Sequence, residues 1–305
     1  MRILLLLLII LTQPLFSQQK EISLEAFHSM KNGDYYTILN HNSHGTYMDK
    51  YDYKTLEKVE TLVLGKDLEG IKYFDDYTFS SDEKKVIIGV NLEKIYRRSK
   101  IGRYYVYDLA NKNLESISEL NIQEPSFSPD GNKIAFVHNN NVYIKDLISK
   151  KTIQITSDGE KNKIINGITD WVYEEEFSLV RAFEWNSASN KLAFIRFDET
   201  EVPEFSMDIY TKGLYPSKQT FKYPKAGEKN SKVSLHLYDL LNTEKFEIDL
   251  KSYKQHYIPR IQWTEAADQL IITTINRHQN NLNLVSFSAD NKDAMLLINE
   301  KDAAY

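Results

Sequence analysis

The sequence predicts an all-β protein, a β-propeller built from four-stranded antiparallel blades. Aromatic residues make up 12% of the 305 residues, with 20 Tyr and 14 Phe, and such side chains suit half-buried strands. Hydrophobic residues make up 42% and charged residues 27%, which leaves enough apolar surface for a packed core. One frame of strand and turn residues also recurs along the chain. These observations favour many short strands over a helical bundle.

The recurring frame places an aromatic residue seven positions before a new apolar run. Four copies begin at Phe79, Phe127, Trp185 and Trp263. In the copy after Phe127, the residues at 129–131 are Pro-Asp-Gly. They suit a tight turn, because proline fixes φ, aspartate bonds locally and glycine accepts positive φ. Each copy therefore predicts a strand, a turn and a second strand.

A third strand is expected to follow each frame and to end in an apolar-Asp-Leu signature, and a polar turn then leads into a fourth. The third-strand candidates are residues 105–109, 142–147 and 235–240, and the fourth-strand candidates are 152–156 and 245–250. Four antiparallel strands repeated radially are the plan of a propeller. A β-sandwich also has many short strands, but four copies of one frame favour the propeller. A weaker fifth unit is expected around residues 35–64.

The first residues have the pattern of an export signal. Arg2 supplies a positive end, residues 3–11 are an unbroken apolar run, and Ser17 precedes a polar stretch. This run is too short for a membrane span, which needs roughly 20 residues. A buried strand or a membrane anchor is the alternative, but this order of features is typical of a signal peptide. We therefore expect residues 1–17 to be removed and the mature chain, without a membrane span, to be periplasmic or secreted.

Composition excludes several classes of function. Cysteine is absent, which excludes disulfides, a thiol nucleophile, thiolate metal sites and lipid attachment through cysteine. The net charge is −5 and no basic block is present, so a nucleic-acid partner is not expected. His41 and His44 fit a polar turn better than a metal site. No cofactor or metal is expected.

The distances between the anchor aromatic residues are uneven, at 48, 58 and 78 residues. Strands cannot absorb this difference, so the excess predicts two excursions from the blades. The first spans roughly residues 157–182 and the second roughly residues 198–231. Long loops on a rigid scaffold often carry function.

The first excursion carries a carboxylate cluster. Thr169 or Asp170 can cap a short helix, and three successive glutamates at 174–176 follow among aromatic residues. Most such runs are solvated acidic turns, but the flanking apolar side chains make full solvation of all three unfavourable. A visiting cation would relieve the repulsion, and an ammonium with three donors matches two converging carboxylates. Calcium is the rival, yet the run lacks the glycine-assisted turns typical of its sites.

Residues 166–177, with Asp-Glu-Thr-Glu-Val-Pro at 198–203 and Tyr-Pro-Lys-Ala-Gly at 223–227, resemble the propeller of the dipeptidyl peptidase IV family. That family belongs to the prolyl oligopeptidase class of serine peptidases. The resemblance extends from about residue 77 to about residue 263. It implies a propeller of eight blades, of which about five are present in residues 18–305, followed by an α/β-hydrolase domain that is absent from this chain.

The resemblance also implies roles for individual residues. Two adjacent glutamates in the family grip the free α-amino group of the substrate, and the motif places this role on Glu175 and Glu176. Glu174 is then expected to be structural or a neighbour in the network. An arginine ahead of a Tyr-Asp-Leu strand holds a substrate carbonyl, which favours Arg97, with Arg98 as the adjacent alternative. Without the resemblance, a surface ion pair would be the expectation for either arginine.

A catalytic centre is not expected in this chain. Such peptidases place their nucleophile in a Gly-x-Ser-x-Gly turn, and none of the eleven glycines has serine two positions later. The chain alone is therefore expected to be inactive. The first interpretation is the propeller part of an exported dipeptidyl peptidase that releases X-Pro or X-Ala dipeptides. Its partners are then the missing hydrolase domain and, in a homodimer, a second copy of the chain. The second is a non-catalytic module that binds peptides or a protein partner.

Overall fold

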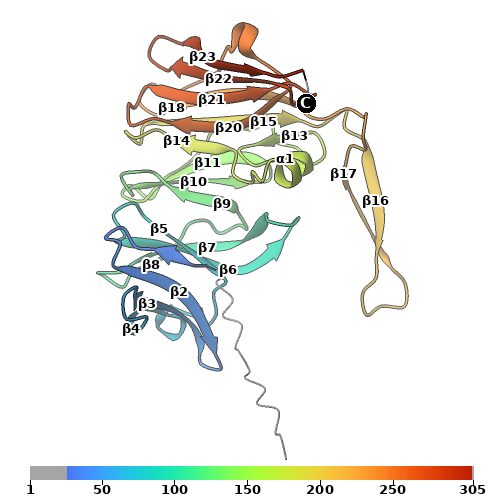
Figure 1. Cartoon of the computed structure of the whole chain (residues 1–305). Helices are drawn as coiled ribbons and strands as arrows, with labels where there is room; N and C mark the ends of the chain where they lie inside the picture. Colours follow the sequence, from blue (N-terminus) through green and yellow to red (C-terminus); the bar gives the residue numbers. More distant parts are fainter. Residues whose placement is uncertain (1–25, 304–305) are drawn as a thin grey trace, which may run out of the picture.

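The computed structural model describes residues 26–303, and the predicted signal peptide lies outside the described residues. Five antiparallel sheets follow one another in chain order, from the blue end of the molecule to the red end (Figure 1). The first three contain β1 (His28–Ser29), β2 (Tyr35–Asn42), β3 (Gly45–Asp52) and β4 (Lys58–Leu64); β5 (Asp76–Phe79), β6 (Lys85–Lys94), β7 (Lys100–Asp108) and β8 (Leu114–Ser116); and β9 (Gln123–Phe127), β10 (Lys133–His138), β11 (Asn141–Asp146) and β12 (Thr152–Gln154). A short 3-10 turn, Gly65–Asp67, follows β4.

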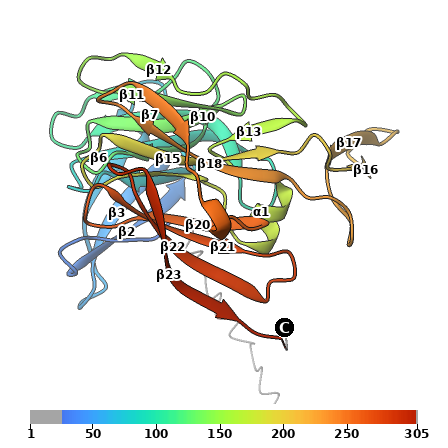
Figure 2. The same cartoon turned by 90° about the horizontal axis from the view of Figure 1, so that it is seen from above.

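The fourth sheet contains β13 (Ile164–Asn166), β14 (Phe183–Trp185), β15 (Lys191–Asp198), β18 (Lys232–Asp239) and β19 (Glu244–Glu247). The fifth contains β20 (Tyr257–Trp263), β21 (Gln269–Ile275), β22 (Asn281–Ser288) and β23 (Asp293–Lys301), and a 3-10 turn, Lys251–Tyr253, precedes it. A separate ribbon, β16 (Glu204–Ile209) with β17 (Ser217–Lys222), extends away from the sheets in both views (Figures 1 and 2). The predicted all-β fold of four-stranded antiparallel sheets is confirmed, and the first sheet is the weaker unit expected at 35–64.

The recurring frame explains how each sheet after the first begins. In all four copies the anchor aromatic residue pairs with the residue seven positions later, as Phe79 does with Val86 and Trp263 with Leu270. The residue after the aromatic closes the turn, because its backbone N–H donates to the carbonyl five positions on. Ser128 shows a second bond, since its Oγ accepts the N–H of Lys133 at 3.0 Å. The seven-residue spacing therefore sets the register.

The aspartate of the apolar-Asp-Leu signature forms the next turn. Asp146 Oδ1 accepts the backbone N–H groups of Ile148 and Ser149, at 3.0 and 2.6 Å. Asp108 and Asp239 make the same pair of bonds two and three residues on. These bonds lower the pKa of the Asp146 carboxyl, with the Ser149 N–H as the largest cause. Local side-chain bonding of this kind is a turn signal, and here it directs the chain into the fourth strand.

The first strand of the fourth sheet, which lies at the edge of that sheet, is split in two by an insertion. β13 pairs with the end of β15, at Ile164↔Asp198, while β14 pairs with its beginning, at Phe183↔Phe194. Between them, Gly167 N–H donates to the carbonyl of Ile195 at 3.0 Å, and Ile195 N–H donates to Ala182 at 2.8 Å. The predicted first excursion of 157–182 is therefore too long, because β13 belongs to the sheet and only about residues 167–182 leave it.

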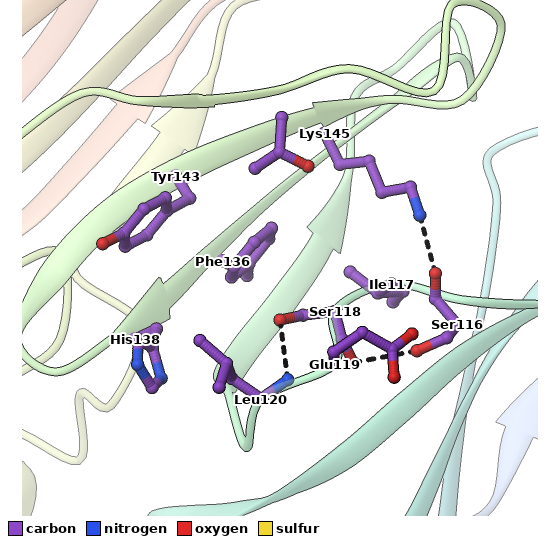
Figure 3. Close-up of a pocket in the computed structure, with 10 residues that line it drawn as sticks. Ser116, Ile117, Ser118, Glu119, Leu120, Phe136, His138, Tyr143 and Lys145 are labelled. Atoms are coloured by element: carbon purple, nitrogen blue, oxygen red, sulfur yellow. Dashed lines mark hydrogen bonds between the residues drawn. The ribbon is translucent and has the colours of Figure 1, made fainter.

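The second and third sheets pack face to face through an apolar cluster that includes Ile87, Ile122 and Ile134. At the edge of this contact lies a cavity of about 370 Å³. Phe136 and Tyr143 stack on one side, with ring centroids 5.5 Å apart, and residues 116–120 lie on the other (Figure 3). Lys145 Nζ donates to the Ser116 carbonyl at 2.6 Å and pairs with Glu115 at 3.0 Å, so its charge serves to hold the two sheets together.

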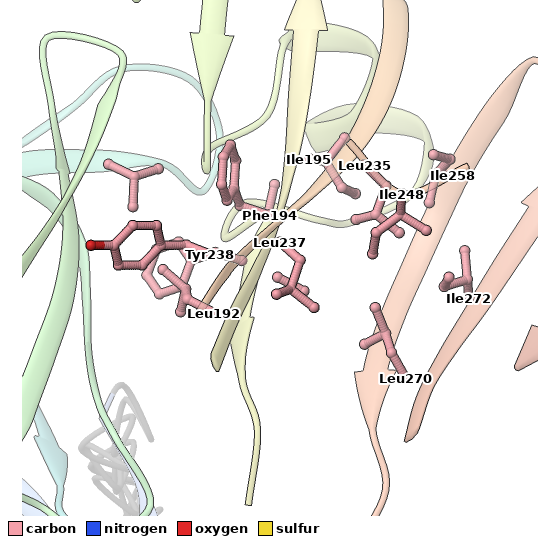
Figure 4. Packing of buried hydrophobic residues seen from close by; sticks show 14 of the residues in the cluster. Leu192, Phe194, Ile195, Leu235, Leu237, Tyr238, Ile248, Ile258, Leu270 and Ile272 are labelled. Carbon is pink, nitrogen blue, oxygen red and sulfur yellow. The ribbon is translucent and has the colours of Figure 1, made fainter. Parts of the chain in front are cut away.

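The largest apolar cluster joins the third, fourth and fifth sheets. Strands β15 and β18 supply buried side chains such as Leu192, Phe194 and Leu235, and β21 adds Leu270 and Ile272 (Figure 4). All five are at most 1% exposed. Burial of a large apolar side chain contributes about 1.5–3 kcal/mol, so this cluster makes the fourth sheet a rigid base for its insertions.

Within residues 26–303, no helix is long and apolar enough to cross a membrane. In the same part of the chain, no three His, Asp or Glu side chains gather as a metal site would require. His41 Nδ1 lies 2.9 Å from Thr46 Oγ1, beside the turn that joins β2 to β3.

Candidate functional site

The insertion in the fourth sheet carries the helix α1 (Trp171–Glu176). Asp170 is its N-cap, accepting the backbone N–H of Tyr173 at 3.0 Å, and Ser231 Oγ donates to the other carboxyl oxygen at 2.6 Å. Burial raises the pKa of the Asp170 carboxyl, and the bonds from Ser231 and Tyr173 oppose this rise. Thr169 instead closes the insertion, since its hydroxyl donates to the Leu179 carbonyl at 2.8 Å. Of the two predicted caps, Asp170 is the one used.

Tyr173 joins α1 to the fifth sheet. It is 1% exposed, and its ring contacts Phe197 and Tyr257, with centroids 4.8 and 6.1 Å away. Its hydroxyl accepts the backbone N–H of Ile258 at 2.9 Å. Burial raises the pKa of this phenol well above its usual value. A neutral, hydrogen-bonded tyrosine therefore fixes the helix against β20.

Glu174 joins α1 to the second sheet. It is 1% exposed, and its Oε1 accepts the backbone N–H groups of Arg98 and Ser99, at 2.5 and 2.9 Å. In return, Arg98 Nη1 donates to the Glu174 carbonyl at 2.9 Å. Charge-assisted bonds of this kind are the stronger class of hydrogen bond. Glu174 thus holds the β6–β7 turn that carries Arg97, which agrees with the structural role expected for it.

Glu175 and Arg97 meet directly. Arg97 Nε lies 3.0 Å from Glu175 Oε2, and the two side chains are 70% and 16% exposed. The structure therefore brings together two of the three predicted site residues, although they lie 78 positions apart in the sequence. An ion pair with one exposed partner contributes at most about 1 kcal/mol. A ligand ammonium can compete with Arg97 for this carboxylate at low cost.

Glu176 is exposed and lines a separate cavity of about 460 Å³. Among the ion pairs of residues 26–303, none involves Glu176, so the two adjacent carboxylates differ in their surroundings. Glu175 is engaged by Arg97, while Glu176 is open to a ligand. The cavity is lined by Trp171, Val172, Glu176, Phe177, Tyr223, Pro224, Lys225, Ala226, Asn230, Tyr257, Arg277 and Gln279.

The second excursion packs against both parts of the site. The Trp171 and Tyr223 rings lie 4.3 Å apart, and the Tyr96 and Phe221 rings lie 5.9 Å apart. Phe221 therefore contacts the β6–β7 turn just before Arg97, and Tyr223 contacts α1. The Tyr-Pro-Lys-Ala-Gly segment at 223–227 carried part of the family resemblance, but its sequence predicted no role for it in the site. The only sequence signal for a role of this segment was its place at the end of the long second excursion.

A further cavity of about 490 Å³ lies between this excursion and the β6–β7 turn, and Glu199 lines it together with Tyr96 and Lys222. Glu199 is 6% exposed, and burial raises the pKa of its carboxyl to about 7. Asp170 raises this pKa further, while Lys222 opposes the rise. Burial also raises the pKa of the Tyr96 hydroxyl, helped by the charge of Glu199. A buried carboxyl group, that of Glu199, therefore lies next to the β6–β7 turn of the site and has a pKa near neutral pH.

Comparison with known proteins shows which family this chain is similar to. Residues 80–305 match the family model described as the dipeptidyl peptidase IV (DPP IV) N-terminal region. The crystal structure of Porphyromonas gingivalis dipeptidyl peptidase 4 matches with a TM-score of 0.84 at 36% identity, covering 91% of this chain and 40% of that chain. Dipeptidyl aminopeptidase B of Saccharomyces cerevisiae is 32% identical over 271 residues, 86% of this chain and 32% of that protein.

A crystal structure of a putative dipeptidyl aminopeptidase IV from Bacteroides ovatus shares the fold, with a TM-score of 0.60 at 20% identity over 89% of this chain and 37% of that chain. The class defined by these matches is the all-β N-terminal region of a dipeptidyl peptidase. The chain belongs to the dipeptidyl peptidase IV family. It spans about a third of the length of the yeast relative.

Proposed function

We propose that this chain is the propeller part of an exported serine-type dipeptidyl peptidase that removes X-Pro or X-Ala dipeptides from peptide N-termini. Glu175 and Glu176 bind the free α-amino group of the substrate, and Arg97 binds a carbonyl of its first residues. The nucleophile belongs to an α/β-hydrolase domain, and the five sheets of this chain are part of an eight-bladed ring. No residue of this chain is proposed to take part in bond cleavage.

The observation that carries the proposal is the fixed position of α1. Asp170, Tyr173 and Glu174 are buried and bonded to three different parts of the chain. The two carboxylates that follow emerge from this base, one beside Arg97 and one at a cavity. The backbone that carries these two carboxylates is therefore ordered before a ligand arrives, which saves part of the entropy cost of binding.

The chemistry of the three residues suits a peptide N-terminus. An ammonium offers three donors and a carboxylate accepts several bonds, so one ammonium can contact Glu175 and Glu176 together. When it does, the Arg97 guanidinium is released from its pair with Glu175 and keeps donors for a carbonyl. Acetylation of the peptide removes the charge and two of the three donors, so the same site discriminates against blocked N-termini.

We also propose a homodimer in which the β16–β17 ribbon makes contacts. Its tip exposes Tyr210, Leu214 and Tyr215, which are 81%, 90% and 81% exposed. Contiguous exposed apolar side chains of this kind often mark interaction surfaces.

A binding experiment tests the amine site. Gly-Pro-Ala and its N-acetyl form are titrated into the 305-residue chain by calorimetry, and we expect only the free peptide to bind. Equal binding of both peptides would contradict the role of the glutamates. Hydrolysis of a Gly-Pro chromogenic amide by this chain alone is expected to be absent. If the chain joined to a family hydrolase domain also leaves the amide intact, the non-catalytic binding module is the better description.

A further inference from the structure

The cavity beside Glu176 has charges of both signs on its walls. Glu176 stands on the α1 side, while Lys225 and Arg277 come from the loop after β17 and from the β21–β22 turn. Neither cation has a carboxylate partner among the ion pairs of residues 26–303. A cavity of about 460 Å³ is of the size that small ligands occupy.

Arg277 is held in place but keeps its binding capacity. One of its Nη atoms donates to the Glu228 backbone carbonyl at 2.5 Å. A guanidinium has five N–H donors, so the others remain available to a ligand. The Glu228 carboxylate accepts the Lys225 backbone N–H at 2.8 Å, which shapes the loop that presents Lys225.

Tyr257 marks the point where the two signs of charge meet. Its hydroxyl is bonded by Asn230 Nδ2 at 2.5 Å, and its ring packs on Phe177 with centroids 5.3 Å apart. Burial raises the pKa of this phenol, Arg277 lowers it and Glu176 raises it. The charges of Arg277 and Glu176 therefore both act on Tyr257, and the three residues line the same cavity.

We propose that this cavity is a subsite for the side chain of the substrate's first residue, and that Lys225 and Arg277 make it favour aspartate or glutamate there. This inference rests on the proposed function, because the amine bound at Glu176 is what places the side chain in the cavity. A carboxylate in the cavity separates Glu176 from the two cations and satisfies donors that no carboxylate of the described chain occupies. Arg277 contributes most, since its planar fork matches a carboxylate with two bonds.

The experiment uses the full chain and matched peptides. Asp-Pro-Ala and Asn-Pro-Ala differ by one charge at constant shape, and each is made with a free and an acetylated N-terminus. Trp171 lines the cavity, whereas Trp185 and Trp263 are only 7% and 8% exposed, so tryptophan fluorescence reports binding. At low salt we expect Asp-Pro-Ala to bind about fivefold more tightly than Asn-Pro-Ala, because the modest free energy of an exposed ion pair corresponds to a change in affinity of about this size.

Two variants and a salt series decide the outcome. Arg277→Gln is expected to remove most of the Asp-over-Asn ratio and Lys225→Gln a smaller part. Lys66→Gln, a change at an exposed lysine in the 3-10 turn after β4, is expected to leave the ratio intact. In the unchanged chain, the ratio is expected to fall toward one at about 1 M salt, since screening there acts within about 3 Å.

The two proposals fail in different ways. A ratio of one in the unchanged chain at low salt, with acetylated peptides still excluded, overturns the subsite and leaves the amine site standing. A ratio unaffected by Arg277→Gln and by salt also overturns the subsite. If acetylated peptides bind as tightly as free ones, or if no peptide binds, the amine site and the subsite that depends on it both fall.

Discussion

Two segments leave the fourth sheet, and they are built in opposite ways. The insertion between β13 and β14 is fixed to three neighbours through Asp170, Tyr173 and Glu174, all buried. The longer segment between β15 and β18 is fixed only at its base and ends in an exposed ribbon. Length therefore does not tell which excursion is rigid. Buried polar groups with partners do, because leaving such a group unbonded costs about 1–3 kcal/mol.

The largest expected effect comes from breaking the rigid insertion. Glu174→Ala removes the acceptor of the Arg98 and Ser99 N–H groups, and we expect a loss of about 3 kcal/mol in the free energy of unfolding. Glu174→Gln keeps an acceptor oxygen and serves as the control with a smaller loss. Urea unfolding measures both variants. Equal stability of Glu174→Ala and the unchanged chain would show that these bonds do not hold the insertion.

A pH series sharpens the comparison at the base of the second segment. The pKa of Glu199 is raised by burial, from 4.5 to about 7, so the folded chain keeps a proton that the unfolded chain releases above pH 4.5. The stability from this proton is fully present below pH 4.5 and is lost as pH rises through about 7. This difference in pKa between the unfolded and folded chain corresponds to a loss of roughly 3 kcal/mol in the free energy of unfolding once the proton is fully released.

The matched variant for this pH series is Glu199→Gln, which has no proton to lose. Urea unfolding from pH 4.5 to 8 is expected to show a steeper decline for the unchanged chain than for the variant. The pKa of Asp170 is also raised, and its repulsion of Glu199 is absent from the variant, so the difference between the two curves reports Glu199 together with this repulsion. Parallel curves would place the titration of Glu199 outside this window.

Substitution of the site carboxylates tests the use of the rigid insertion. Glu175→Gln and Glu176→Gln are each expected to weaken binding of a free-amine peptide about tenfold, because each removes one charge-assisted bond. Folding is expected to be unaffected, since neither carboxylate accepts a backbone N–H in the described chain. Calorimetry with Gly-Pro-Ala measures the loss. Asp208→Asn, a change in the exposed β16 strand, is the control and is expected to bind normally.

The smallest effect on stability is expected at the ribbon tip. Joint replacement of Tyr210, Leu214 and Tyr215 by serine removes highly exposed side chains, so the melting temperature is expected to move by no more than about 1–2 °C. The same variant is expected to be monomeric in sedimentation experiments in which the unchanged chain is dimeric. A large fall in stability would show that the ribbon is part of the folded core after all.

Much of the fold could be predicted because its signals are local. The aromatic residue seven positions before an apolar run, and the aspartate at the end of a third strand, each act through pairings within seven residues. The assignment of β13 to the first excursion failed for the opposite reason. In the sheet β13 pairs with residues 196–198 of β15. This pairing joins segments about 30 positions apart and leaves no local pattern in the sequence.

The candidate site shows the same division. The glutamates and the Asp170 cap could be found from one continuous motif, and Arg97 from a resemblance. Tyr257 and Arg277 escaped notice and Lys225 was given no role, because the three residues come from separate segments and meet only in the folded chain. The difference between Glu175 and Glu176 also depends on a contact across 78 positions, which adjacent residues in a sequence cannot reveal.

The two ends of the insertion are bonded directly to each other, because Ala182 N–H donates to the Gly167 carbonyl at 2.9 Å. Gly167 adopts a φ of +75° there, and any Cβ would lie 2.6 Å from a methyl group of Val142. The strands on either side of the insertion consequently keep their alignment whatever its exposed residues are. Substitution of an exposed residue such as Glu176 can therefore alter ligand binding without disturbing the sheet, whereas the buried Asp170, Tyr173 and Glu174 must be kept because they bond the insertion to its neighbours.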